Sequence, residues 1–309
     1  MSAPIALFAY NRPDKLKASL ESLRANQGAR SSDLYIFVDG PRDAQDIAKV
    51  ERVSDISRST EGFRSVTVKI SQKNLGLANS IRLGISTVFQ ESNSIIVIED
   101  DLLLGSTFLE FMNAGLTRFA TDQRVASIQG FQYPVSPPLT ELVAIRGADC
   151  WGWATWKDRW DSTIFDTNQL LSELRSRSLE YEFDLDGSMA YTKMLENQER
   201  GLIDSWAICW HASMFLQDRV SIHPSESLVF NSGNDGLGTH KSNHSMFDTN
   251  LGSWNSQQAW PIPQESESYR TQLITFYDLS FNKRLSVLTR VAARLMHQLD
   301  KIRSKIKSC

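Results

Sequence analysis

The sequence lacks most of the features that mark specialised classes of protein. Its 309 residues include three widely spaced cysteines (Cys150, Cys209 and Cys309) and no Cys-x-x-Cys pair. Neither a disulfide framework nor a zinc ribbon is therefore expected, and a reducing compartment fits best. No apolar stretch approaches the ~20 residues that cross a bilayer, and the first residues lack the basic and apolar regions of a signal peptide. These absences predict a globular protein of the cytoplasm.

A large excess of one charge is missing as well. The chain has 33 Lys and Arg against 36 Asp and Glu, a formal net charge of −3. Residues 283–309, however, hold eight Lys and Arg against one acid, Asp300, so residues 1–282 carry a net charge of −10. An acidic body argues against nucleic-acid binding, because that affinity comes largely from neutralised phosphates.

Strand and helix signals alternate in the first 125 residues. Apolar runs predict four strands, and apolar residues at helical spacing fill the intervals between them, with one helix from about Leu75 to Gln90. Repeated units of this kind predict a parallel sheet with helices on both faces. The four predicted strands are Ile5–Tyr10, Leu34–Val38, Val66–Ile70 and Ile95–Ile98.

The pattern after residue 125 is less regular. A strand is predicted at Val125–Phe131, and Asn231–Asn250 is predicted to be a long loop because it is rich in Gly, Asn and Ser without periodicity. Helices are predicted over 167–180, 187–200 and 203–217.

Three consecutive acids, Glu99, Asp100 and Asp101, directly follow the fourth predicted strand. Ligands of open α/β sheets bind at the carboxyl ends of the strands, and carboxylate oxygens are the ligands that Mg²⁺ and Mn²⁺ prefer. The alternative is a solvated strand end, with Asp101 capping the helix that follows. The triplet alone does not separate these two interpretations.

Further polar residues are expected at the same edge of the sheet. Asp39 follows the second strand, where it could accept a hydrogen bond from a ribose or a base, or simply form a turn. Asn74 and Gly76 stand at a helix start, which suits phosphate or ribose, although Asn74 could merely cap the helix. Arg12 follows the first strand and supplies a cation.

In this order the residues resemble those of a known family, the GT-A-fold glycosyltransferases. The likeness is to the inverting family 2 and to the N-acetylglucosaminyltransferase I type, and it spans roughly residues 4–245. Trp151–Trp156 and Ile203–Trp206 resemble segments of bacterial members that modify surface polysaccharides. The motifs that carry the likeness are Asn11-Arg12-Pro13, Asp39, Asn74-Leu75-Gly76-Leu77-Ala78 and Glu99-Asp100-Asp101.

The resemblance implies a mixed, mostly parallel Rossmann-like sheet flanked by helices. It also implies metal-dependent, inverting transfer of a sugar from a nucleotide sugar, with a UDP-sugar as first guess, to a hydroxyl of a glycan or lipid-linked acceptor. Mn²⁺ or Mg²⁺ would be the cofactor. Donor-binding residues would be Asn11, Arg12, Asp39 at the nucleoside, Asn74, Gly76, and Glu99 and Asp100 near the sugar and ribose.

Metal ligands are implied by the same resemblance. Asp101 would bind the ion that bridges the diphosphate. A late histidine would add a ligand, and His240 in Gly-Leu-Gly-Thr-His fits this place, with His244 and His223 as competitors. A neutral imidazole can complete an oxygen-rich site.

Inversion requires a carboxylate base on the acceptor side, and we predict Asp204. It stands at the start of a predicted helix with Trp206 and Trp210, an apolar setting that would strengthen it as a base. The alternative is an acid that interacts only with the helix N-terminus. Asp149 and Asp158, beside the tryptophan cluster, are the other candidates.

Four of the eight tryptophans lie within ten residues, at positions 151, 153, 156 and 160. Aromatic faces stack on sugars, but tryptophans are more often buried in cores, so we expect at least two of these four to be structural.

Two rival functions remain. A non-catalytic glycan-binding protein of the same fold would show no donor turnover. A sugar nucleotidyltransferase would need a glycine-rich loop after the first strand, and Tyr10–Lys15 contains no glycine.

The predicted organisation is one domain over residues 1–280 and a basic helix over residues 281–309. The nucleotide-sugar-binding half would span about 1–125 and the acceptor-side half about 126–280. Apolar residues at spacings of three and four make the last segment amphipathic, which suits an anionic membrane surface on the inner face of the membrane. A coiled coil or packing on its own domain are the alternatives.

Overall fold

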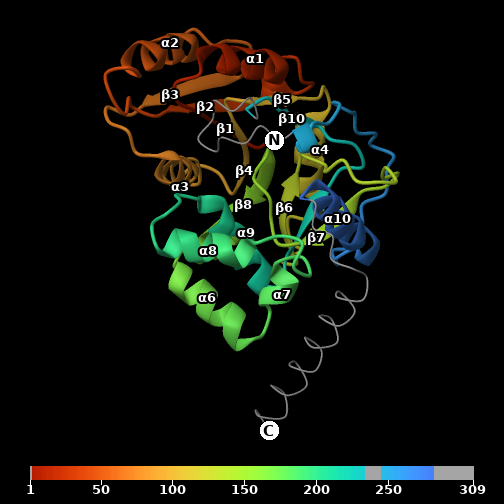
Figure 1. Ribbon diagram of the computed structural model, residues 1–309. Coiled ribbons are helices and arrows are strands. Elements are labelled where there is room, and N and C mark those ends of the chain that lie inside the picture. Colours follow the sequence, from red (N-terminus) through yellow and green to blue (C-terminus); the bar gives the residue numbers. More distant parts are fainter. Residues whose placement is uncertain (1, 234–244, 282–309) are drawn as a thin grey trace.

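The computed structural model describes residues 2–233 and 245–281. Its centre is a mixed eight-stranded sheet in the order β3-β2-β1-β4-β8-β6-β9-β7, with helices on both faces (Figure 1). The first four strands of this order are parallel to one another. They are β1 Ile5–Ala9, β2 Asp33–Val38, β3 Ser65–Ile70 and β4 Ser94–Glu99. The predicted α/β class with a mostly parallel sheet is confirmed.

The second half of the sheet mixes strand directions. β8 lies antiparallel between β4 and β6, β6 is parallel to β9, and β7 closes the sheet antiparallel to β9. A separate antiparallel ribbon pairs β5 with β10. Of these strands, β6 alone was predicted from the sequence. Their bounds are β5 Leu102–Leu104, β6 Val125–Gln129, β7 Val143–Arg146, β8 Trp153–Trp156, β9 Val220–His223 and β10 Val229–Asn231.

Helices cover the two faces unequally. α1, α2 and α4 pack against one face of the sheet, while α3 and α9 cover the other. α6 and α8 form a further layer against α9, and α10 lies beside β7 (Figure 1). The bounds are α1 Pro13–Arg24, α2 Ile47–Arg58, α3 Leu77–Val88, α4 Phe108–Arg118, α5 Lys157–Asp161, α6 Thr167–Ser176, α7 Glu180–Phe183, α8 Tyr191–Glu199, α9 Trp206–Leu216 and α10 Glu267–Ser280. Short 3-10 turns lie at Ala29–Ser31 and Ser245–Phe247.

Strand β3 is one of the two edge strands of the sheet, and its residues are exposed or half-buried. The apolar run that predicted β3 is therefore not buried on both faces, whereas β1 is. Lys69 on this strand is a typical edge residue, since a charged side chain discourages pairing with another chain.

The tryptophan cluster is largely core. Trp153, Trp160, Trp206 and Trp210 pack together between the sheet and α9, with ring centroids 5.5–6.1 Å apart in neighbouring pairs. Trp156 is also buried, so the prediction that at least two of four tryptophans are structural is confirmed. Trp151 is half-buried and lines a pocket instead.

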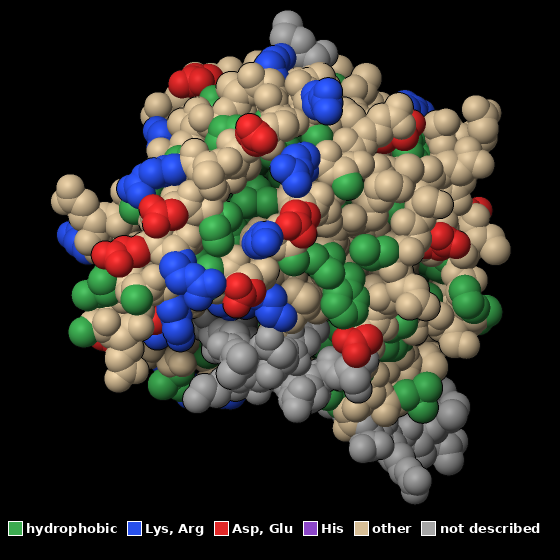
Figure 2. All heavy atoms as spheres, turned by 90° about the horizontal axis from the view of Figure 1, so that it is seen from above, with side chains coloured by type: hydrophobic (Ala, Val, Ile, Leu, Met, Phe, Trp, Pro, Cys, Tyr) green, Lys and Arg blue, Asp and Glu red, His purple; other side chains and the backbone are tan. Residues whose placement is uncertain are grey.

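Within the described ranges, no helix is both long and apolar enough to span a membrane. The face seen from above carries basic and acidic side chains mixed together rather than a field of one sign (Figure 2). The predicted basic helix falls, apart from Phe281, outside the described residues.

Candidate functional site

The strand register brings the predicted site residues to one end of the sheet, where the carboxyl ends of the parallel strands meet. We call this end the carboxyl edge; it is not an edge strand such as β3. Phe8 of β1 pairs with Glu99, and Ala9 pairs with Val38, so Arg12, Asp39 and Asp100 all follow strands that end together. β8 runs in the opposite direction, and its first residue, Trp153, pairs with Val97. The segment that precedes β8 therefore reaches the same edge.

Arg12 bridges the two aspartates of the triplet. Its Nη2 donates to Asp100 Oδ1 at 2.6 Å and its Nη1 donates to Asp101 Oδ2 at 2.9 Å. Asp100 is 1% exposed and also accepts from the Tyr10 backbone N–H at 3.1 Å. A guanidinium fork is well suited to hold two carboxylates in fixed positions.

Arg12 pairs with two of the three carboxyl groups, and its charge also acts on the third, Glu99. Burial, followed by the charges of Asp101 and Asp100, raises the pKa of Glu99 to about 8. Burial also raises the pKa of Asp100 to about 6, although Arg12 opposes the rise. The carboxyl edge therefore has too little positive charge to balance these acids. A divalent cation or a cationic group of a ligand would stabilise the ionised forms of Glu99 and Asp100.

The residue after the triplet begins strand β5, not a helix, so the capping alternative for Asp101 is wrong. β5 pairs with β10, and the next residue, Ser232, donates both its backbone N–H and its hydroxyl to the Asp101 carbonyl. Gly233 lies against the carboxylate: a Cβ there would stand 2.1 Å from Asp101 Oδ2. The chain that leads toward His240 thus passes Asp101, while His240 itself and His244 lie outside the described residues.

Among the described residues, no group of three or more His, Cys, Asp and Glu side chains is arranged to hold a metal ion. The chemistry of the triplet nevertheless fits Mg²⁺ or Mn²⁺, because such ions are commonly held by one or two carboxylates together with the phosphates of a substrate. Asp100 is fully buried, whereas Asp101 is 9% exposed and Glu99 is half-buried, so a ligand could reach these two carboxyls.

Asp39 holds the loop before α3. Its carboxylate accepts hydrogen bonds from the backbone N–H groups of Leu75 (2.8 Å) and Gly76 (3.1 Å), and from Asn74 Nδ2 (3.1 Å). Asn74 also donates to the Gly40 carbonyl at 2.9 Å, so it does not cap α3. Gly76 precedes the helix with a φ of +78°, a conformation that favours glycine.

Asn11 is held on the same side of the site. Its Nδ2 donates to Asp46 Oδ1 at 2.7 Å, and the Tyr10 hydroxyl donates to the same carboxylate. The sequence did not predict Asp46 as a site residue, because it lies in a polar segment without a recognisable motif.

Asp204 does not have the apolar setting that its prediction assumed. It is exposed, and Ser205 rather than Asp204 caps α9, by accepting from the Ile208 backbone N–H. Its Oδ2 does lie near the loop before α3, 3.3 Å from the place where a Cβ would stand on Gly76.

The other two candidate bases differ sharply in position. Asp158 follows β8 at the opposite edge, where it forms an ion pair with Arg159 at 2.7 Å. Asp149 lies in the segment before β8 and is half-buried. It accepts from the Tyr133 hydroxyl at 2.6 Å and from the Cys150 backbone N–H at 2.7 Å.

Asp149 is also close to the acidic triplet. The neighbouring thiol, Cys150, has its pKa raised well above the usual value, by burial first and then by the charges of Asp149, Glu99 and Asp101. The strand register agrees, because Trp153 pairs with Val97 and the segment before β8, which carries Asp149, therefore runs toward the end of β4 that carries the triplet.

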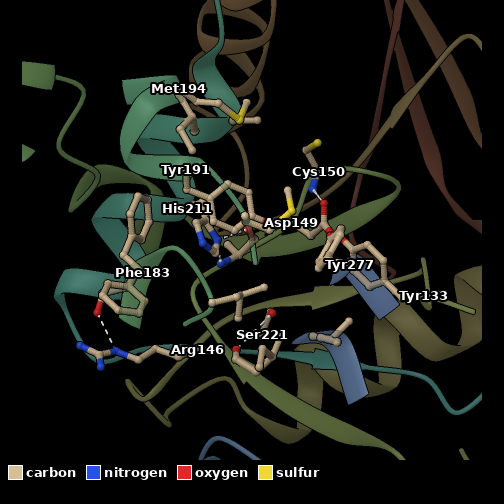
Figure 3. A pocket seen from close by; sticks show the side chains of 18 of the residues that line it. Tyr133, Arg146, Asp149, Cys150, Phe183, Tyr191, Met194, His211, Ser221 and Tyr277 are labelled. Atoms are coloured by element: carbon tan, nitrogen blue, oxygen red, sulfur yellow. Dashed lines mark hydrogen bonds between the residues drawn. The ribbon is translucent and has the colours of Figure 1, made fainter. Parts of the chain in front are cut away.

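Asp149 belongs to a pocket of about 270 Å³ that is lined by residues from Tyr133 to Tyr277. Figure 3 shows Asp149 with Tyr133 and Tyr277 at one end of this pocket and Arg146 at the other. His223, the competitor metal ligand, lines the pocket with both ring nitrogens engaged, to Ser221 Oγ and to the Phe131 carbonyl, at 3.0 Å each. It is therefore not available to a metal beside Asp101.

The chain matches no protein-family model. Structural comparison finds S. aureus TarS at 12% identity and a TM-score of 0.35, over 46% of this chain and 25% of that chain. It also finds mannosyltransferase PcManGT from Pyrobaculum calidifontis in complex with GDP-Man and Mn²⁺, at 10% identity and a TM-score of 0.37, over 70% of each chain. Mannose-1-phosphate geranyltransferase from Thermus thermophilus has 12% identity and a TM-score of 0.33, over 72% of this chain and 74% of that chain. With TM-scores of this size, the likenesses decide neither activity nor ligands.

Proposed function

We propose that this protein is a metal-dependent, inverting glycosyltransferase that uses a nucleotide sugar, a UDP-sugar as first guess. The acceptor would be a hydroxyl of a glycan or of a lipid-linked glycan. The observation that carries the proposal is the acidic edge: Glu99, Asp100 and Asp101 follow one another there, Arg12 pairs with the two aspartates, and the pocket beside them contains a further carboxylate, Asp149. A sugar transferase needs both parts, one for the leaving diphosphate and one for the accepting hydroxyl.

The donor-side roles follow from the contacts of each residue. Asp101 would hold Mn²⁺ or Mg²⁺, which would neutralise the charge of the leaving diphosphate. Arg12 fixes Asp100 and Asp101 in place. Asp39 orders the loop of Asn74 and Gly76, whose backbone then lies ready at the start of a helix for the ribose or a phosphate.

We assign the base to Asp149 and give Asp204 a place on the donor side. Asp149 is half-buried, it is oriented by Tyr133, and it lies within the pocket. Removal of the acceptor proton by a positioned carboxylate is worth ~10²–10⁴ in rate. Asp204 is exposed and lies beside Gly76, so it is better placed to contact the donor than to contact a group in the pocket.

A thermal-shift screen tests this proposal. UDP, GDP and their sugar conjugates would each be added with and without Mn²⁺, because a ligand that binds the native state raises the unfolding temperature, and tighter binding raises it further. The proposal predicts a metal-dependent shift with one nucleotide class, followed by release of that nucleoside diphosphate when an acceptor is supplied. Absence of any nucleotide-dependent shift would contradict it.

The same screen separates the two rival functions. A nucleotidyltransferase would be stabilised by a nucleoside triphosphate and would release pyrophosphate. A glycan-binding protein would be stabilised by glycans alone, and Asp101→Asn would leave that binding unchanged.

A further inference from the structure

Aromatic and sulfur-containing side chains form a large part of the wall of the pocket on the acceptor-side half. Trp151 meets Phe247 edge to face with ring centroids 5.5 Å apart, and Tyr133 meets Tyr277 edge to face at 5.7 Å. Met194 on α8 is 36% exposed and lies at the rim, so the pocket opens to solvent there. A volume of about 270 Å³ is near the lower end for small-molecule sites, which suits one ring rather than a long chain.

The cations that line this pocket are already neutralised. Arg146 pairs with Glu182 at 2.7 Å and with Asp218 at 2.6 Å. Arg270 pairs with Asp186 at 2.7 Å and lies 3.7 Å from Glu265. The lining arginines therefore offer no excess positive charge to a ligand.

The histidines of the pocket add no charge near neutral pH. Burial lowers the pKa of both His211 and His223, and His211 is further fixed by the Ala148 backbone through its Nδ1. Asp149 is then the charged group that an entering ligand meets beside these aromatic walls. An anionic ligand would lose its hydration and face a like charge, and both effects cost free energy.

We propose that this pocket selects a neutral, ring-sized acceptor group, which presents an apolar face to Trp151 and the tyrosines and donates one hydroxyl to Asp149. This assignment rests on the proposed function, in which the bound group is the acceptor of the transferred sugar. It excludes acceptor groups that carry a carboxylate or phosphate on the bound ring. Each Asp149 oxygen accepts one hydrogen bond in the structure and retains a second acceptor site for a ligand hydroxyl. Aromatic faces beside one hydrogen-bonding carboxylate fit a sugar ring with its axial C–H groups on one side.

Two probes that differ in one group test the charge selection directly. Phenyl β-D-glucopyranoside and phenyl β-D-glucuronide have the same ring and the same substituent, but the second carries a carboxylate. Binding of each to the full-length protein would be measured by calorimetric titration and by saturation-transfer NMR, with no donor present. We expect the glucuronide to bind at least about tenfold more weakly, and Asp149→Asn to bring the two affinities closer together.

Pocket-filling variants locate the binding. Ala207→Phe fills the wall on α9, and Met194→Trp fills the exposed rim if the first variant unfolds. Either variant should lose glucoside binding, while Ala44→Phe at an exposed loop position should keep it. Equal binding of the two probes to the wild type, binding of neither probe, or retention of glucoside binding by a folded pocket-filling variant would overturn the assignment.

Failure of this inference is distinguishable from failure of the proposed function. Loss of every nucleotide effect with retained glucoside selectivity would contradict the glycosyltransferase proposal and leave the pocket assignment standing. Metal-dependent nucleotide binding without glucoside selectivity would contradict the pocket assignment and leave the glycosyltransferase proposal standing.

Discussion

The Tyr133 hydroxyl donates a 2.6 Å hydrogen bond to Asp149 Oδ2. The two residues come from separate segments, one after β6 and one before β8, and their bond fixes the carboxylate at the aromatic end of the pocket (Figure 3). Burial and the nearby charge of Asp149 raise the pKa of Tyr133 well above its usual value, so this tyrosine stays a hydrogen-bond donor.

Replacement of Asp149 by Asn should remove the base while preserving its shape. We expect turnover to fall by ~10²–10⁴, with the affinities for nucleotide and metal unchanged, because Asp149 contacts neither in our proposal. Steady-state transfer assays and nucleotide titration would measure the two effects. Tyr133→Phe should give a smaller loss of turnover, because it removes one hydrogen bond that orients the Asp149 carboxylate and keeps the carboxylate itself.

Two control variants sharpen that prediction. Asp158→Asn, at the opposite edge of the sheet, should have near-wild-type turnover. Asp204→Asn should weaken donor affinity more than it lowers turnover. A large loss of turnover in Asp204→Asn together with normal transfer by Asp149→Asn would restore Asp204 as the base.

Asp39 should be needed to order the loop of Asn74 and Gly76, which we propose contacts the donor. The Leu75 N–H donates to Asp39 Oδ1 and the Gly76 N–H donates to Oδ2, so Asp39→Asn turns an NH₂ group toward one of these two donors. An unsatisfied buried donor costs about 1–3 kcal/mol, so we expect lower stability in urea unfolding and weaker nucleotide binding. Asp43→Asn, at an exposed loop position, is the matched control and should change neither. Unchanged stability of Asp39→Asn would contradict this role.

Glu99 should make the stability of the metal-free protein depend on pH. Its pKa is about 8 in the folded protein against an ordinary value of 4.5, so between those values the folded state binds the proton more tightly than the unfolded state. Stability should therefore fall as the pH rises from about 5 to 8. Glu99→Gln lacks this titration, so urea unfolding should show its stability rising relative to wild type by on the order of 1 kcal/mol or more over that range. Glu51→Gln, at an exposed helix position, should track the wild type, and parallel curves for Glu99→Gln and wild type would contradict the prediction.

The first half of the fold could be predicted because its signals are local. β1, β2 and β4 are short apolar runs, and the residues that follow them reach one edge whenever such strands are parallel. β8 has no comparable signal. Trp153-Ala-Thr-Trp156 lacks a period of two, since it is buried on both faces, and its reversed direction is set by pairing with distant strands.

That non-local pairing explains why the sequence predicted an apolar setting for Asp204, which the structure does not have. A helix start next to Trp206 indicated an apolar environment for Asp204, but the tryptophan rings turn into the core with Trp153 and leave Asp204 exposed. Asp149 was recognised only as an alternative. Its place beside Glu99 depends on the register of Val97 with Trp153, which local pattern does not specify.

The central claim is that Asp101 holds a metal together with a nucleoside diphosphate. Calorimetric titration of UDP and GDP into metal-free protein, with and without Mn²⁺, tests it most directly, with Asp101→Asn and the exposed Asp55→Asn as a matched pair. We predict that Mn²⁺ raises the affinity for one of the two nucleotides at least about tenfold in the wild type and in Asp55→Asn, and has no such effect in Asp101→Asn. Nucleotide affinity that is the same with and without Mn²⁺, or a full Mn²⁺ effect in Asp101→Asn, would contradict the claim.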